Sequence, residues 1–404
     1  MIQYTKVDAC RCCGSGQLEP VLNLGRQPLA NDYVKQPIAQ PTYPLELFVC
    51  RQCYHNQLSI AVDPNQMFKE YLYVSGTSRT LRDHFSEFAK DTLSHLEPGK
   101  KRVLDIACND GTLLTKYRDL GCSVHGVDPA ANLVKLVRDQ GIAVVEGYWP
   151  DASKDIVGRF DIVTACNVLA HVAEPARFLS AMLSALSPDG VAVVEFPYAR
   201  EMVLRNEWDT IYHEHLSYFL VAPFLKLAER VGAVVTYVKT TPIHGGSIRF
   251  GLRRMGGSHC AEANSLAMTE QVAGLHDLET YIKFAKQVSK TCRELVEGVG
   301  AKLDAGYQVV GYGASAKGNT LLNHCPLALT YIVDDNPLKH GHFTPGRHLP
   351  IRPVSVLSGE RQDLAIVMLA WNFADEIKAN VRRLRPGRED LALCHVPNFS
   401  VTPI

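Results

Sequence analysis

Five short apolar runs alternate with helix-like segments between residues 66 and 255, and this alternation constrains the fold more than any other feature of the chain. The runs are VLDI (103–106), SVHGVD (123–128), IAVVEG (142–147), FDIVTAC (160–166) and VAVVEF (191–196). Each has the length of a strand, and strands that alternate with helices form a parallel sheet with crossover helices. The pattern therefore predicts an α/β domain with a Rossmann-like core.

The remaining residues form three further segments. YQVVGYGASAKGNTLLNHC (307–325) reads as a second strand, glycine turn and helix, and TYIVDDN (330–336) and LAIVMLAW (364–371) continue it. An apolar stripe with helical spacing predicts one amphipathic helix over residues 270–300; its members are Leu275, Leu278, Ile282, Ala285, Cys292, Leu295 and Val299. The expected domains are a cysteine-rich module at 1–65, an α/β domain at 66–255, a helical connection at 256–300 and a second Rossmann-like domain at 301–404.

Composition excludes several classes of protein. Lys and Arg together number 42, as do Asp and Glu, so net charge gives no case for a nucleic-acid partner. No apolar run reaches the length of about 18 residues that a membrane span needs. The start, MIQYTKVDACRCC, lacks the pattern of a signal peptide, so we expect a cytoplasmic protein. In a reducing compartment the clustered cysteines are more often metal ligands than disulfides.

Two CxxC pairs lie in the N-terminal module. Cys10 with Cys13, and Cys50 with Cys53, supply four thiolates, which is the ligand number of tetrahedral zinc. Because all four positions are filled by protein, the expected zinc ion is structural. The alternative is a pair of redox dithiols, but no thioredoxin-like βαβ pattern surrounds them. Cys12, inside the first pair, is a competing ligand.

RVLDIACNDGTLL (102–114) is a strand, a tight turn and a helix, and Asp128 follows at the end of the next strand. This is the plan of a nucleotide-cofactor site, in which the acidic residue takes ribose hydroxyls. A dinucleotide site needs G-x-G-x-x-G, whereas Asp110 here would repel a pyrophosphate. The turn therefore favours S-adenosylmethionine (SAM) over NAD. The alternative is that Asp110 and Gly111 form a plain turn and that Asp105 is a structural partner at the strand end.

Several motifs together make the chain resemble the sugar C-methyltransferases that act on nucleotide-linked 4-keto-deoxysugars. They are CRCCG (10–14), LGRQPLAN (24–31), CRQC (50–53), YLYVSGTS (71–78), DIACNDG (105–111), YHEHLSYF (212–219), HGGSIR (244–249) and GYGASAKGNTLLN (311–323). The resemblance covers nearly the whole chain. It implies a class I SAM-methyltransferase Rossmann-like core, a small N-terminal zinc-binding module and a second, C-terminal Rossmann-like α/β domain.

The resemblance also implies a set of cofactor-binding residues. They are Tyr73, Ser75, Asp105, Ala107, Asn109, Asp110, Gly111, Asp128, Pro129 and Asn167. One position departs from the family pattern, because Ala107 stands where the first glycine of the motif is usual. Alanine suits this position if the residue has a negative φ.

The Tyr-x-Glu-His cluster carries the expected chemistry. A carbon beside a ketone becomes a nucleophile only after it loses a proton, so the enzyme needs a base and a donor for the enolate oxygen. The resemblance places Tyr212, Glu214, His215 and His171 at the sugar. We expect His215 to be the base, Tyr212 and His171 to hold the keto or enolate oxygen, and Glu214 to orient a partner. The alternatives are ordinary hydrogen-bonded histidines, or a metal held by His213 and His215.

The remaining motifs predict contacts to the substrate. Ser315 and Lys317 in the C-terminal glycine turn suit a diphosphate, although a degenerate Rossmann-like half without a ligand is an equal alternative. HGGSIR presents His244, Ser247 and Arg249 to the sugar nucleotide or simply forms a hairpin; Tyr218 is a further candidate.

The expected function is SAM-dependent methylation of a nucleotide-linked, dTDP-type 4-keto-deoxysugar at C3, in deoxysugar, natural-product or polysaccharide biosynthesis. The competing functions are a small-molecule O- or N-methyltransferase, an NAD-dependent oxidoreductase that uses the C-terminal glycine turn, and a zinc-anchored scaffold without catalysis. We expect a nucleotide-sugar ligand and a monomer or weak homodimer.

Overall fold

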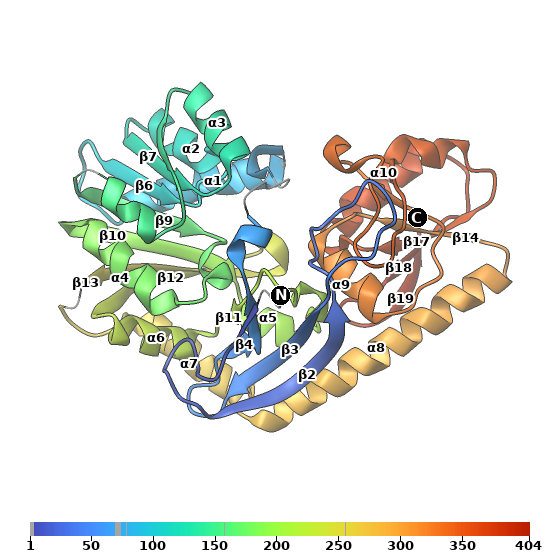
Figure 1. The fold of residues 1–404 in the computed structure, drawn as a ribbon, viewed down its shortest axis with the longest axis horizontal. Coiled ribbons are helices and arrows are strands. Elements are labelled where there is room, and N and C mark those ends of the chain that lie inside the picture. Colours follow the sequence, from blue (N-terminus) through green and yellow to red (C-terminus); the bar gives the residue numbers. More distant parts are fainter. Residues whose placement is uncertain (1–3, 69–73, 78, 157, 255) are drawn as a thin grey trace.

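The computed structural model describes residues 4–68, 74–77, 79–156, 158–254 and 256–404. Two α/β domains lie on either side of the N-terminal strands, and one long helix, α8 (Leu278–Asp304), runs beneath those strands and links the two (Figure 1). Tyr73 lies outside the described residues. No helix in the described part of the chain is both long and apolar enough to cross a membrane.

The first α/β domain is built on a seven-stranded sheet in the order β12-β13-β10-β9-β6-β7-β8. Its strands are β6 (Arg102–Ile106), β7 (Ser123–Asp128), β8 (Ala143–Glu146), β9 (Phe160–Cys166), β10 (Leu186–Pro197), β12 (Ala233–Thr241) and β13 (Ser247–Arg254). The first five pair in parallel and correspond to the five apolar runs, whereas β12 and β13 form an antiparallel hairpin at one edge. The expected α/β fold class is confirmed.

Six α-helices in the described part of the chain accompany this sheet. They are α1 (Arg79–Ser94), α2 (Thr112–Asp119), α3 (Ala131–Asp139), α4 (Pro175–Ala185), α5 (Ala199–Leu204) and α6 (Val221–Arg230). Central strands with both faces covered are continuously apolar, and VAVVEF in β10 is buried throughout. The carboxyl ends of the parallel strands therefore form the open edge on which loops can build a site.

The N-terminal module shares a sheet and hydrogen bonds with a segment that follows the first α/β domain's helix α5. It contains β1 (Tyr4–Lys6), β2 (Leu18–Gln27), β3 (Tyr43–Cys50), β4 (Asn56–Leu58) and β5 (Ile60–Val62). The short strand β11 (Ser217–Tyr218) completes its sheet in the order β11-β4-β3-β2. The buried Arg11 donates to the carbonyls of Leu58 and Leu216, at 3.0 and 3.1 Å. Because β11 follows residues 212–216 directly, the module fixes the position of the Tyr-x-Glu-His cluster.

Two helices, not one, connect the α/β domains. The first, α7 (Ala261–Val272), is separated from α8 by a turn in which Gly274 has φ +77° and Asp277 caps α8. The prediction of one continuous helix with one apolar stripe is therefore wrong in part, since Ile282, a member of that stripe, is 39% exposed. The residues that α8 buries are Tyr281, Phe284, Val288, Thr291, Leu295 and Val299.

The C-terminal α/β domain has the strand order β16-β15-β14-β17-β18-β19. Its elements are β14 (Gln308–Tyr312), α9 (Ala316–His324), β15 (Ile332–Asp334), β16 (Ile351–Pro353), β17 (Leu364–Met368), α10 (Ala374–Leu384), β18 (Leu391–Cys394) and β19 (Ser400–Pro403). If the six strands are numbered 1 to 6 along the chain, their order across the sheet is 3-2-1-4-5-6, and the last strand is antiparallel to its neighbour. This is the order of a dinucleotide-binding sheet, so a second Rossmann-like domain is confirmed.

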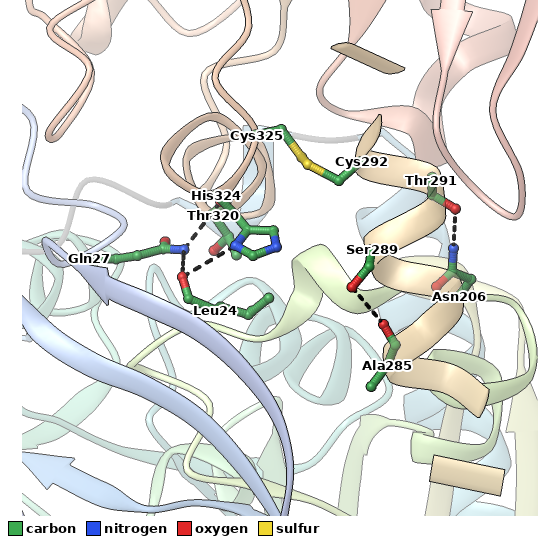
Figure 2. Close-up of a disulfide and its surroundings, with 10 residues drawn as sticks. All are labelled: Leu24, Gln27, Asn206, Ala285, Ser289, Thr291, Cys292, Thr320, His324 and Cys325. Carbon is green, nitrogen blue, oxygen red and sulfur yellow. Dashed lines mark hydrogen bonds between the residues drawn. A yellow bond between two sulfur atoms is a disulfide. The ribbon is translucent and has the colours of Figure 1, made fainter. Parts of the chain in front are cut away.

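A disulfide joins the connecting helix to this domain. Figure 2 shows Cys292 on α8 bonded to Cys325 at the end of α9, with the two Cα atoms 5.8 Å apart. Nearby, Gln27 on β2 donates to the carbonyl oxygens of both Leu24 and Thr320, at 3.2 and 3.5 Å. The expectation that cysteines serve as metal ligands did not anticipate this pair. The helix α9 is thereby joined to both α8 and the N-terminal module.

Candidate functional site

A cavity of about 1990 Å³ lies where the three parts of the chain meet. It is bordered by the carboxyl ends of β6, β7 and β9, by the segment 29–33 of the N-terminal module, and by the glycine turn of the C-terminal domain. Fifteen of the predicted site residues line it: Ser75, Asp105, Ala107, Asn109, Asp128, Pro129, Asn167, His171, Tyr212, Glu214, His215, Tyr218, His244, Ser315 and Lys317. Residues from distant parts of the sequence thus converge on one space.

Asp128 anchors the cofactor turn. Its two carboxylate oxygens accept the backbone N–H groups of Asn109 at 2.8 Å and Ala130 at 2.9 Å. Burial raises the pKa of Asp128 to about 6. Each oxygen keeps a second lone pair, so the carboxylate can also accept from ribose hydroxyls in the cavity. Asp105 lies deeper, where Thr164 donates to it at 2.6 Å.

The turn requires left-handed backbone at Ala107, with φ +55°, and at Asn109, with φ +53°. Asn167, directly after β9, is also left-handed, with φ +55°. The negative φ under which Ala107 would fit without strain is therefore not met; the chain reverses sharply, and Cys108 N donates to the Val127 carbonyl, 3.1 Å away. A left-handed residue with a Cβ costs about 1–2 kcal/mol. Strain of this kind gathers at ligand sites, and these residues line the cavity.

Asp110 has a different role from the one expected. Its carboxylate accepts from Gly76 N at 2.8 Å and from the Thr112 hydroxyl at 2.7 Å, so it faces the segment 75–77 and not the cavity. Ser75 N donates to Asn109 Oδ1 at 2.9 Å in the same contact. Asp110 is therefore a positioning residue that holds this segment over the turn. Gly111, with φ +77°, starts α2 and does not line the cavity.

Tyr212 and His215 form a hydrogen-bonded pair. The His215 Nδ1–H donates to the Thr210 carbonyl at 3.0 Å, which leaves Nε2 as an acceptor for the Tyr212 hydroxyl at 2.9 Å. The His171 ring packs edge-on against His215 with centroids 4.9 Å apart. Burial lowers the pKa of His215 well below its usual value and that of His171 to about 4. Both imidazoles are therefore neutral at physiological pH.

Glu214 and His213, from the same segment, contact the N-terminal module. Asn31 donates to Glu214 Oε1 at 2.6 Å, and His213 Nε2 donates to the Pro44 carbonyl at 3.2 Å. The metal alternative for His213 and His215 finds no support, since the two rings have separate partners. Among the described residues, the group whose ligand atoms converge as for a metal consists of the four cysteines.

The ligand atoms of Cys10, Cys13, Cys50 and Cys53 all lie within 4.8 Å of one another. The sulfurs of Cys10 and Cys53 are 3.5 Å apart and those of Cys13 and Cys50 are 3.6 Å apart. Four sulfurs at about 2.3 Å from one zinc ion would be separated by about 3.8 Å, so the set fits tetrahedral zinc. Cys12 is fully buried outside this set and does not compete.

Ser247 and Arg249 do not reach the cavity. Arg249 is 1% exposed, and its guanidinium pairs with Glu195 at 2.8 Å and Asp91 at 2.7 Å. Ser247 donates to the Ile243 carbonyl at 3.0 Å. The expectation of substrate contacts fails here because Arg249 already joins β13 to β10 and α1, and the Ser247 hydroxyl is used within the hairpin. The hairpin interpretation holds for these two residues, whereas His244, with φ +58°, lines the cavity.

The C-terminal turn presents a cation and a helix end to the same cavity. Lys317 Nζ donates to Asn372 Oδ1 at 2.7 Å and lies 4.2 Å from the centre of the Trp371 ring. Ser315 caps α9, since its hydroxyl accepts from Gly318 N at 3.0 Å.

The sequence interpretation missed Asp334, although an acidic residue about 20 positions after such a turn is a known signal. It also missed Glu207, which stands in a loop without any motif.

Family models match in three consecutive segments. A zinc-binding domain matches residues 10–68, a methyltransferase domain residues 73–238 and a C-methyltransferase C-terminal domain residues 242–391. The C-methyltransferase NovU of Streptomyces niveus is 32% identical over 391 residues, covering 93% of this chain and 92% of the relative.

Two further matches cover smaller shares of the chain. The ubiquinone biosynthesis O-methyltransferase of Xanthomonas axonopodis pv. citri is 36% identical over 105 residues, which is 24% of this chain and 43% of that protein. A magnesium protoporphyrin IX methyltransferase from Synechocystis PCC 6803 superposes with a TM-score of 0.34 and 15% identity over 43% of this chain and 79% of that one.

Proposed function

Because the chain belongs to the C-methyltransferase family, we propose that it methylates the carbon beside the ketone of a nucleotide-linked 4-keto-deoxysugar, with C3 as the methylated carbon and dTDP as the nucleotide. The protein is a SAM-dependent C-methyltransferase with an N-terminal zinc-binding domain. The observation that carries the proposal is the hydrogen bond between Tyr212 and His215 inside the cavity that also contains the cofactor turn.

The cofactor turn would hold SAM through polar groups that already face the cavity. Asp128 would accept from the ribose hydroxyls, and Asn109, Pro129 and Asn167 would line the same pocket. Ser75 lies on the segment that Asp110 fastens over the turn. When bound, SAM supplies an electrophilic methyl group. The protein must then provide a carbanion equivalent and keep it away from water.

His215 would remove the proton from the acceptor carbon. Its neutral imidazole has one lone pair, on Nε2, and the Thr210 carbonyl fixes that tautomer. Because the Tyr212 hydroxyl donates to this lone pair at 2.9 Å, it must turn toward the keto oxygen before Nε2 can take the proton. Once Nε2 is protonated it donates to the Tyr212 oxygen, so the Tyr212 hydroxyl proton is free to move toward the enolate oxygen. A lowered pKa makes His215 a weak base by itself, and stabilisation of the enolate by Tyr212 and His171 must compensate. Glu214, held by Asn31, would orient the sugar.

The C-terminal domain would hold the nucleotide. Lys317 and the amide groups at the start of α9 suit a diphosphate, and Asp334 at the end of β15 suits a hydroxyl of the nucleoside. Ser315 would contribute through its backbone, because its hydroxyl is the helix cap. Tyr218 and His244 also line the cavity and would contact the sugar.

Incubation with SAM and a panel of nucleotide-linked 4-keto-deoxysugars tests this proposal. We expect one sugar to gain the mass of one CH₂ group, and the enzyme to exchange the proton beside its ketone with deuterium from solvent. An O- or N-methyltransferase would methylate without that exchange. A methylated product that keeps every proton of the carbon beside the ketone would contradict carbon methylation.

A matched pair of variants tests the base. His215→Asn should lower methyl transfer at least about 100-fold while SAM binding is retained. His213→Asn is the control, since that ring faces the N-terminal module, and it should keep most of the turnover. Near-normal turnover of His215→Asn would exclude His215 as the base.

A further inference from the structure

Glu207 is a buried carboxyl group that borders the cavity and that the mechanism above does not use. It lies between α5 and the short 3₁₀ helix Trp208–Thr210, is 3% exposed, and lines the cavity. Its Oε1 accepts no hydrogen bond from the described residues. Arg205 Nε, on a side chain that is 49% exposed, forms an ion pair with the same Oε1 at 3.5 Å. A buried carboxylate oxygen that has this ion pair but no hydrogen bond can gain one from a bound ligand.

The HGGSIR hairpin is shaped around this carboxyl. Gly245 has φ +97°, and a Cβ at that position would lie 2.8 Å from Glu207 Oε2 and 2.9 Å from the Trp371 ring. Glycine therefore lets the hairpin of the first α/β domain approach both Glu207 and the C-terminal domain. This accounts for one of the paired glycines that the sequence motif singled out.

Glu207 belongs to the same short segment as the catalytic pair. Its carbonyl accepts from Thr210 N at 3.1 Å, and the Thr210 carbonyl in turn accepts from His215 Nδ1 at 3.0 Å. The segment that fixes the His215 tautomer is thus joined to Glu207 through the backbone. Lys317, which suits the diphosphate, also acts on the pKa of the Glu207 carboxyl. The carboxyl group therefore stands near both the catalytic pair and the proposed diphosphate site, where the sugar ring that joins them would lie.

The charges around Glu207 determine which ligand group it can bind. Burial raises the pKa of Glu207 to about 8, against the opposing effects of Arg205 and Lys317 and with the help of Asp209 and Glu201. A protonated carboxyl group offers one donor and one acceptor and carries no charge. The Lys317 ammonium faces the same region, so a cationic substituent on the ligand would be repelled. A neutral hydroxyl group can pair with a protonated carboxyl group and is not repelled by the Lys317 ammonium.

We propose that Glu207 binds a hydroxyl group of the substrate's sugar ring and thereby selects sugars that retain this hydroxyl. The inference rests on the proposed function, because it takes the ligand to be a keto sugar. It adds a specificity-determining residue that acts through contact with the sugar, beside the residues that move the proton.

Replacement by residues of similar size separates binding from folding. Glu207→Met cannot make the hydrogen bond but removes the buried carboxyl, so it should fold at least as stably as the wild type. We expect it to raise KM for the active keto sugar roughly tenfold or more, with kcat and the dissociation constant of SAM little changed. Glu207→Gln keeps a donor and an acceptor and should restore KM to near the wild-type value. A purely structural role would instead make Glu207→Met less stable.

The control and the substrates complete the test. Glu201→Gln changes a neighbouring carboxyl group that does not line the cavity, and it should leave KM unchanged. The wild type should prefer the hydroxylated sugar over its deoxy analogues, and Glu207→Met should lose that preference at one ring position. Unchanged KM and unchanged preference in Glu207→Met would overturn the inference while the proposed function stands. A wild type that methylates no keto sugar would instead reject the proposed function.

Discussion

Asp128 and Asp334 end equivalent strands of the two sheets and make the same pair of hydrogen bonds. Asp128 accepts from the N–H of Asn109 in the preceding turn and from the N–H two residues after itself. Asp334 does the same with Ala314 at 2.6 Å and Asn336 at 2.8 Å. Both residues line one cavity from opposite sides. The two domains therefore present two nucleoside-binding edges to a shared space.

This duplication predicts that the two carboxylates serve different ligands. Asp128→Asn should weaken SAM binding about tenfold or more and leave the affinity for a nucleoside diphosphate unchanged, because hydrogen bonds to a charged group contribute about 1.5–3 kcal/mol. Asp334→Asn should show the reverse. Calorimetric titration of both variants with both ligands measures this, and each variant is the control for the other. If Asp334→Asn weakened SAM as strongly as the nucleotide, the separation of the two sites would be rejected.

The left-handed conformation of Ala107 predicts a stabilising substitution. Ala107→Gly removes a steric cost of about 1–2 kcal/mol in the folded state and adds an entropic cost of about 0.5–1 kcal/mol, so the free energy of unfolding should rise by up to about 1 kcal/mol. Ala130→Gly is the matched control, since Ala130 is buried with φ −85°. It should lower the free energy of unfolding. Urea titration measures both, and a destabilised Ala107→Gly would show that the alanine methyl group has a packing role.

The zinc module predicts that one metal ion holds the N-terminal segment. Cys53→Ser should lose most of the zinc and several kcal/mol of stability, because metal binding and folding are coupled. Cys12→Ser changes a cysteine that is equally buried but lies outside the ligand set, so it should keep its zinc. Elemental analysis of the purified proteins measures the metal content. A reduced, freshly purified wild type without metal would contradict the assignment.

Local patterns were enough to predict the parts of the fold that depend on nearby residues. The five parallel strands, the second glycine turn and the cysteine quartet each follow from a short stretch of sequence with its own physical reason. The break between α7 and α8 was also signalled, by Gly274 and Asp277, but counting apolar spacing across it hid the signal.

Contacts between distant residues explain what could not be predicted. Arg249 looks like a ligand-binding cation until α1 brings Asp91 to it, and Asp110 looks like a ligand group until the segment at Gly76 closes over the turn. Glu207 carries no motif, and its importance comes from a cavity that three parts of the chain build together. The spacing of residues in a sequence does not show which buried polar groups find partners in the folded chain and which do not.

Asp105 predicts how stability depends on pH. Burial raises its pKa from 3.8 to about 7, while Thr164 opposes this shift by donating to it. Between those two values the folded chain binds more protons at Asp105 than the unfolded chain does. Stability from this group is therefore full below the unfolded pKa and falls as pH rises through the folded pKa.

Asp105→Asn removes this titrating group, so comparing it with the wild type measures how much Asp105 contributes to the pH dependence of stability. Without SAM, the free energy of unfolding of the wild type should fall relative to that of Asp105→Asn between about pH 4 and pH 7, by a few kcal/mol in order of magnitude. Urea titrations at several pH values give the difference directly, and other buried carboxyl groups cancel because both proteins contain them. Parallel curves for the two proteins would mean that Asp105 is ionised as readily in the folded chain as in the unfolded chain.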